Sequence, residues 1–254
     1  MRSLVLFSLS TLIACGSPPK PVDAGIPIDT RCGIDCAAQK SYGLLLNTCF
    51  EYADGPVATD PPAIGVFVRE VFTLEGGVKT LSVEYSSGGQ KKMTDSFGIV
   101  NGTLLLMRRE FAGGQSVTYR NATTDIVGVG WLERNAGVGS NVETTVSADV
   151  LRTGGSRMSE ATTYRVTLAA ASDSQTTVPA QAGPVDGGLQ MLFSESPNHG
   201  SDGLRVWVPN LGFINFSSTF LLTGGSSVQY RLQRVRTIDP ASDAGEKPCS
   251  TGTP

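Results

Sequence analysis

The sequence predicts a mainly all-β fold, an antiparallel meander of about a dozen strands curled into a barrel or half-barrel, with one N-terminal helix. From residue 61 onward, apolar residues recur at every second position, which is typical of strands with one buried face. Pairs of turn-forming residues separate these segments, as in tight hairpins. Because no long helical pattern intervenes, we expect neighbouring strands to pair as a meander and not through βαβ units.

Three segments show the alternation most clearly: "VKTLSVEY" (78–85), "VETTVSADV" (142–150) and "ATTYRVTLA" (161–169). In the first, Leu81, Val83 and Tyr85 share one face, and the residues between them are polar or charged. The other predicted strands are 64–74, 91–99, 103–111, 115–121, 126–133, 188–195, 203–208, 212–222 and 227–236. The β domain is expected to cover 61–238.

The turn signals are Gly76-Gly77, Gly88-Gly89, Asn101-Gly102, Gly113-Gly114, Gly154-Gly155 and Gly224-Gly225. Each supplies residues that tolerate the positive φ of a tight turn. The longest polar break is 172–187, which either separates two sheets or forms a flap. A two-sheet β-sandwich is therefore the alternative architecture.

The predicted helix lies in "DCAAQKSYGLLLNTC" (35–49), within a cysteine-containing segment 32–60. Asp35 is the expected N-cap. Ala38, Tyr42, Leu45 and Cys49 would share one face of a helix, although Gly43 weakens its continuity. If the helix runs straight from Cys36 to residue 47, Cys36 and Cys49 are too far apart to bond.

The N-terminus, "MRSLVLFSLSTLIAC", has a positive start and an apolar run of 11 residues, 4–14. That run is too short to span a bilayer as a helix and fits the core of a signal peptide, residues 1–14. The residues Leu12-Ile13-Ala14-Cys15 resemble the lipobox of bacterial lipoproteins. The resemblance implies cleavage before Cys15 and a diacylglyceryl group on its thiol, so that the protein meets the membrane through this lipid; an ordinary secretory signal is the alternative.

Residues 15–31 form the predicted lipid anchor and a proline-rich tether, "GSPPKPVDAGIPIDTR" from 16 to 31. With so little to bury, the tether is expected to be extended. A glycine and not an aspartate follows Cys15, which favours the outer membrane over the inner one in the bacterial cell envelope. Residues 239–254 are expected to be a polar C-terminal tail.

Four cysteines remain after Cys15 is assigned to lipid: Cys32, Cys36, Cys49 and Cys249. In an exported chain, an even number favours two disulfides, whose pairing the sequence leaves open. If both bridges form, Cys249 joins one of the three N-terminal cysteines. The spacing fits zinc poorly, so we expect no metal.

The chain carries a formal net charge of −3 with scattered cations, which gives no footprint for nucleic acid. The one histidine, His199, lies in a predicted solvated turn, and no catalytic or nucleotide-binding motif surrounds it. We expect no enzyme activity and no cofactor. Asp95 and Glu110, and the "MRRE" cluster of 107–110, are interpreted as charges of a wet face or a strand edge, with an anion site at Arg108 and Arg109 as the weaker alternative.

Aromatic residues gather in the second half of the chain: Trp131, Phe193, Trp207, Phe216 and Phe220. They either pack a core or line an apolar cavity within the curled sheet. The sequence therefore predicts a lipid-anchored envelope protein with a structural or interaction role, whose partner would be another envelope protein. The alternative is a binding or carrier module for a hydrophobic ligand, by analogy with envelope lipoproteins whose half-barrels carry lipids.

Overall fold

The computed structural model describes part of the 254-residue chain, and the statements below concern that part: residues 31–54, 63–122, 125–177, 185–199, 203–217, 229–238 and 249. The predicted signal peptide, Cys15, nearly all of the tether and the C-terminal tail other than Cys249 lie outside it.

Two α-helices and thirteen strands make up the described fold. The helices are α1 (Cys36–Tyr42) and α2 (Asp173–Thr176). The strands are β1 (Thr48–Ala53), β2 (Ile64–Thr73), β3 (Lys79–Ser87), β4 (Gln90–Val100), β5 (Thr103–Phe111), β6 (Ser116–Arg120), β7 (Val129–Glu133), β8 (Asn141–Leu151), β9 (Arg157–Ala170), β10 (Leu189–Ser196), β11 (Gly203–Val208), β12 (Gly212–Ser217) and β13 (Gln229–Thr237).

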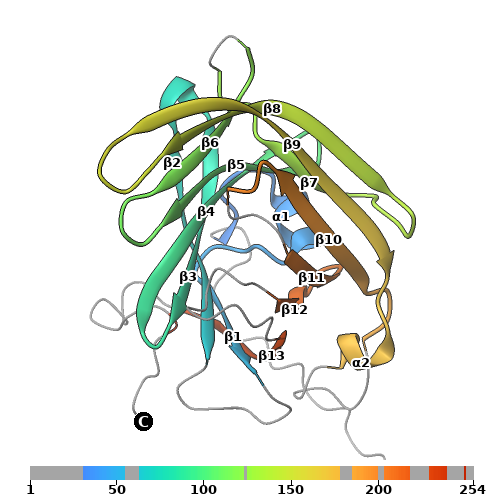
Figure 1. Ribbon diagram of the computed structural model, residues 1–254. Helices are drawn as coiled ribbons and strands as arrows, with labels where there is room; N and C mark the ends of the chain where they lie inside the picture. Colours follow the sequence, from blue (N-terminus) through green and yellow to red (C-terminus); the bar gives the residue numbers. More distant parts are fainter. Residues whose placement is uncertain are drawn as a thin grey trace, which may run out of the picture.

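The sheet closes on itself as an antiparallel barrel of 12 strands (Figure 1). β1 pairs with β13, and β4 pairs with β5, so the order β4-β3-β2-β1-β13-β12-β11-β10-β9-β8-β6-β5 returns to its start. The barrel prediction is confirmed, and the two-sheet alternative is wrong. The polar break 172–187 contains α2, which contacts β11 and β12 without dividing the sheet.

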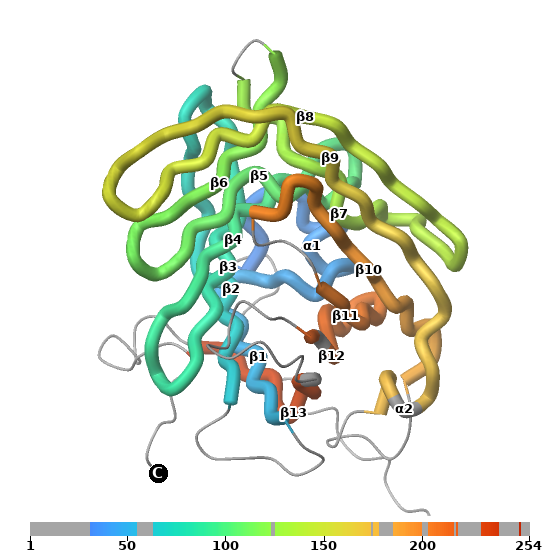
Figure 2. Tube along the Cα trace, viewed as in Figure 1, coloured from blue at the N-terminus to red at the C-terminus, as the bar shows by residue number. Residues whose placement is uncertain are grey.

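β7 departs from the regular wall. It pairs with β5 alongside β6, yet it contacts β8 and β9 without pairing to either (Figure 2). Val129 through Leu132 are all buried. A Cβ on Gly130 would stand 2.9 Å from Val142 Cγ1, so the absence of a side chain at Gly130 lets β7 lie close under β8. The predicted strand 126–133 therefore exists only from Val129.

The predicted turn residues adopt the expected conformation. Gly76, Gly77, Gly88, Gly89, Asn101, Gly102, Gly113, Gly114, Gly154 and Gly155 all have positive φ. Gly224-Gly225 lies outside the described residues. Glycine has no steric cost there, which explains its frequency between the strands.

Helix α1 begins as predicted but ends early. The Asp35 carboxylate accepts a hydrogen bond from the Ala38 amide at 3.0 Å. Gly43 adopts a left-handed φ of 68° and donates back to carbonyl oxygens of the last turn, which terminates the helix after Tyr42. The expectation that Leu45 and Cys49 continue its apolar face is wrong, because the chain turns and enters β1 at Thr48.

The early stop places α1 against turns of the barrel. The amide of Asn210, in the β11–β12 turn, donates to the Ser41 carbonyl at 2.9 Å. The Tyr42 hydroxyl donates to the Leu132 carbonyl in β7 at 2.9 Å and also contacts the Gly102 carbonyl in the β4–β5 turn. α1 therefore joins three parts of the barrel through backbone contacts and one tyrosine.

The fold contains two disulfides. Cys32–Cys36 lies at the start of α1, and Cys49–Cys249 joins β1 to a residue near the C-terminus. The second bridge lies with Phe67 and Ile238 in a small apolar cluster. Because Cys49 belongs to β1, this bridge ties a C-terminal residue to the first strand, at the seam where β1 meets β13. The expectation that Cys249 pairs with an N-terminal cysteine is confirmed.

Charge reinforces the same seam. Glu51 in β1 is 3% exposed and accepts from Arg234 and Arg236 of β13, with Nε to oxygen distances of 2.7 Å for both arginines. A carboxylate so buried is stable only with its partners in place. The seam thus combines backbone pairing, one covalent bond and a three-residue charge cluster.

We predict that replacing Cys49 and Cys249 together by alanine lowers the free energy of unfolding by about 4–5 kcal/mol, because their bridge closes a loop of 200 residues. The matched control, Cys32→Ala with Cys36→Ala, opens a loop of four residues and should cost only about 2 kcal/mol. Urea unfolding of the three proteins measures the difference. Equal losses for the two pairs would contradict the seam's importance.

Candidate functional site

The centre of the barrel is an aromatic cluster around Trp131 of β7. Its ring centroid lies 4.6 Å from that of Phe97, 5.6 Å from Phe193 and 5.5 Å from Phe213. These three phenylalanines come from β4, β10 and β12, so one side chain bridges distant walls of the barrel. Tilted and edge-on ring pairs at these separations are favourable beyond the area that they bury.

A buried cation lies within this cluster. The guanidinium carbon of Arg205, in β11, is 5.3 Å from the ring centroid of Tyr85, 5.1 Å from that of Trp131, and 5.6 Å from those of Phe193 and Phe213. The residue is 3% exposed. Ring faces attract a cation within about 6 Å, and more strongly when it is desolvated. Arg205 therefore occupies the space that a hollow barrel would offer to a ligand.

Among the described residues, a void of about 10 Å³ lies beside Arg205, bordered among others by Tyr52, Tyr85 and Phe213. A volume of that size holds one water molecule at most. Of the residues predicted to line an apolar cavity, Trp131, Phe193 and Trp207 are buried in this packed core. The side chain of Phe216, whose backbone belongs to β12, and all of Phe220 lie outside the described residues.

A buried ion pair also faces the interior. Arg109 of β5 donates from Nε to Asp95 Oδ1 at 2.6 Å and from a terminal nitrogen to Oδ2 at 2.8 Å, with both residues at most 2% exposed. Burial lowers the pKa of Arg109, but the Asp95 charge and its hydrogen bonds outweigh this and raise it overall. The interpretation of Asp95 as a wet-face charge is wrong.

A bulge explains why Arg109 points inward. Phe97 pairs with Leu106 and Ser96 with Arg108, which leaves Met107 as an extra residue in β5. The extra residue shifts the alternation by one, so Arg108 faces outward and Arg109 inward. Asp95 was more accessible to prediction, because it lies between Met93 and Phe97 on the apolar face of β4.

Buried tyrosines complete the polar interior. The Trp131 indole N–H donates to the Tyr164 hydroxyl at 2.6 Å, and the Tyr119 hydroxyl donates to Glu195 at 3.0 Å. Burial raises the pKa of Tyr52, Tyr85 and Tyr164 well above the usual value of a tyrosine. Their hydroxyls are therefore hydrogen-bond donors at any neutral pH.

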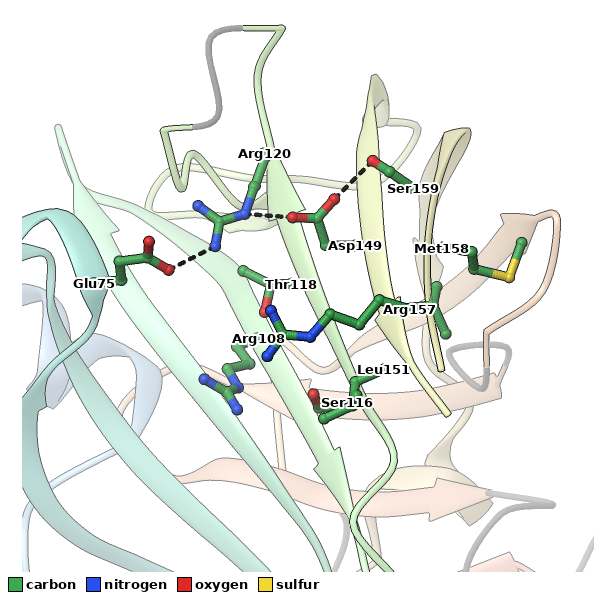
Figure 3. A pocket seen from close by; sticks show the side chains of 11 residues that line it. Glu75, Arg108, Ser116, Thr118, Arg120, Asp149, Leu151, Arg157, Met158 and Ser159 are labelled. Carbon is green, nitrogen blue, oxygen red and sulfur yellow. Dashed lines mark hydrogen bonds and ion pairs between the residues drawn. The ribbon is translucent and has the colours of Figure 1, made fainter. Parts of the chain in front are cut away.

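On the outer face, a groove of about 430 Å³ lies over β5, β6, β8 and β9 (Figure 3). The strand register brings its residues together, since Arg108 pairs with Thr118, Thr118 with Asp149, and Asp149 with Ser159. Two residues along the strands, on the same face of the sheet, Ser116, Leu151 and Arg157 lie in the same cross-strand order. Its size is that of a small-molecule site.

Glu75, in the turn after β2, borders one end of the groove and anchors Arg120. A terminal nitrogen of Arg120 donates to Glu75 at 2.8 Å, and its Nε lies 2.7 Å from an Asp149 oxygen. The hydrogen bond to Glu75 is the largest cause that raises the pKa of Arg120. Burial opposes it, and the charges of Glu75 and Asp149 add to the rise. Behind this turn, Leu74 packs with Met107 and Ile126 in a separate apolar cluster.

His199 is not the solvated turn residue that we predicted. Its side chain is 8% exposed, and Nε2 lies 3.5 Å from a Glu160 oxygen. Its backbone amide donates to Glu195 at 3.0 Å. The loop composition concealed these contacts, because Glu160 lies in β9 and Glu195 in β10.

Comparison with protein-family models, with curated proteins and with solved structures finds no match to the chain. Within the described ranges, no group of three or more His, Cys, Asp or Glu side chains could hold a metal ion. The helices of the same ranges include none that is long and apolar enough to cross a membrane.

We predict that Asp95→Ala lowers the free energy of unfolding by about 3–5 kcal/mol, because it leaves the buried Arg109 charge without its carboxylate. Replacing both partners, Asp95→Leu with Arg109→Met, should recover most of the loss. Glu143→Ala is the control, since it breaks an exposed pair with Arg165 and should cost at most about 1 kcal/mol. Denaturant unfolding that ranks Asp95→Ala with this control would contradict the buried pair.

Proposed function

We propose that this chain is a lipid-anchored protein of the bacterial cell envelope with an interaction role and no catalysis. In this proposal Cys15 carries the lipid, the proline-rich residues up to 31 separate it from the membrane, and the barrel presents its outer surface to a partner. The lipobox-like residues 12–15 support the anchor. The two disulfides support export, because such bonds persist in oxidising compartments.

The observation that carries the interaction role is the filled interior. Trp131 and Arg205 join aromatic side chains from several walls, and the void beside them is about 10 Å³. A carrier of hydrophobic ligands needs a cavity of a few hundred Å³. A ligand at this position would have to displace Arg205 and separate its aromatic neighbours, so the carrier alternative requires the core to unpack. The outer surface requires no such change.

The test is photo-cross-linking in the host, with the full-length chain carrying a photoreactive residue at Val138, Leu192 or Val235. These side chains are 67%, 46% and 44% exposed, so the substitutions leave the core intact. We expect the chain in the membrane fraction, and at least one position joined to an envelope protein. Cys15→Ser is the matched control and should move to the soluble fraction and lose that adduct.

Two results would contradict the proposal. A Cys15→Ser protein that stays in the membrane fraction places the anchor elsewhere. Native mass spectrometry of the host-purified chain that shows a bound hydrophobic ligand of constant mass, together with no cross-linked protein, identifies a carrier instead.

A further inference from the structure

The groove over β5, β6, β8 and β9 gathers more hydrogen-bond donors than its own carboxylates use. Arg108 contributes one terminal nitrogen to Glu110 at 2.6 Å, while its Nε is buried without a hydrogen-bond partner. Arg157 has no ion-pair partner in the described part of the chain. A guanidinium carries five N–H donors and no acceptor, so these two side chains leave unused donors at the groove.

The floor of the groove adds two hydroxyls. Ser116 and Thr118 of β6 are 6% and 7% exposed, and both line the groove. Arg108 and Arg157 lie on either side of them, separated by three strand spacings, or about 14 Å across the strands, and offset by two residues along the strands. Figure 3 shows Arg157 extending from β9 over this floor toward Arg108, so the two guanidinium groups approach from opposite sides.

Three arginines and three carboxylates set the charge around the groove. Arg120 forms ion pairs with Glu75 and Asp149, and one terminal nitrogen of Arg108 forms an ion pair with Glu110. Among the three described arginines that line the groove, Arg157 is the one that forms no ion pair. The net charge of these six groups is zero, so the attraction for an anion is local to Arg157, whose guanidinium has no described carboxylate beside it.

From these contacts we propose that the groove binds a phosphate monoester, with Arg108 and Arg157 pairing its oxygens and with Ser116 and Thr118 donating from the floor. Donors that converge from more than two directions fit the tetrahedral oxygens of phosphate better than the two oxygens of a carboxylate. Arginine pairs with phosphate through two parallel N–H donors. Leu151, which also lines the groove, offers apolar surface to the rest of the ligand. This inference goes beyond the proposed interaction role and adds a ligand site to the same outer surface.

The phosphate belongs to either a soluble compound or a lipid headgroup, and calorimetry distinguishes these sources. The full-length chain, purified in detergent at about 0.15 M salt to screen diffuse attraction, is titrated with glycerol 3-phosphate and with dihexanoyl phosphatidic acid. Dihexanoyl phosphatidylcholine is the control ligand without a monoester. Equal affinity for the first two assigns a soluble ligand, and much tighter binding of phosphatidic acid assigns a headgroup.

The variants are Arg157→Gln and its matched control Arg165→Gln. Arg165 lies on the same strand, is exposed, and pairs with Glu143 away from the groove. We expect Arg157→Gln to weaken phosphate binding about tenfold or more, the effect of losing one charged hydrogen-bonding partner. Arg165→Gln should bind like the parent. Thermal unfolding confirms that both variants are folded.

The inference is overturned if no monoester binds the parent chain, or if the two arginine variants bind alike. Either result leaves the proposed function standing wherever cross-linking still recovers an envelope partner. Conversely, phosphate binding that depends on Arg157, combined with no partner and no Cys15-dependent anchoring, would support the groove while contradicting the interaction role.

Discussion

The cation–π contacts of Arg205 lie at the centre of the barrel, and the surrounding architecture depends on them. A desolvated guanidinium is costly unless its surroundings compensate, and here four rings approach it within 5.6 Å. The rings come from β3, β7, β10 and β12, so the compensation joins opposite walls of the sheet. β7 contacts β8 and β9 without pairing to either, and from this place inside the wall its Trp131 reaches the centre of the barrel.

Closure of the sheet is the second constraint. A closed barrel leaves no row of unpaired backbone groups, which removes the usual site of edge-to-edge association. The weakest place in such a ring is the seam between the first and last strands, because they are far apart in sequence. Here Glu51 pairs with two arginines of β13, and Cys49 bonds to Cys249 beside it. Both the charges and the covalent bond therefore lie where loop closure costs most entropy.

Much of this architecture was predictable because strand alternation and glycine turns are local signals. The all-β meander, the N-cap at Asp35 and the turn at Asn101-Gly102 all follow from neighbouring residues. β1 was missed because it follows α1 after one short turn, and its outward face carries apolar and charged residues that are both buried. The inward position of Arg109 depends on a bulge at Met107. The bulge is visible in the pairing of β5 with β4 and not in the residues of β5 themselves.

The candidate sites show the same limit. Aromatic residues such as Trp131 and Phe193 predicted an apolar interior. The sequence alone left open whether these side chains line a cavity or fill it. The answer depends on Arg205, whose neighbours come from four separate strands. The groove needs the register of β5, β6, β8 and β9 to bring Arg108 and Arg157 over one floor. Such groupings arise from long-range pairing, which no local pattern encodes.

The central claim is that the barrel is a solid protein core, and its tyrosines test this most directly. Burial raises the pKa of Tyr42 to about 12 and that of Tyr52, Tyr85 and Tyr164 further. An unfolded tyrosine ionises near pH 10, so stability is fully present below that pH and is lost as the pH rises toward the folded values. Absorbance at 295 nm, measured from pH 9 to 11.5 beside circular dichroism, should show these tyrosines ionising only when the fold is lost. Ionisation near pH 10 in a protein that stays folded would show a wet, open interior and contradict the account.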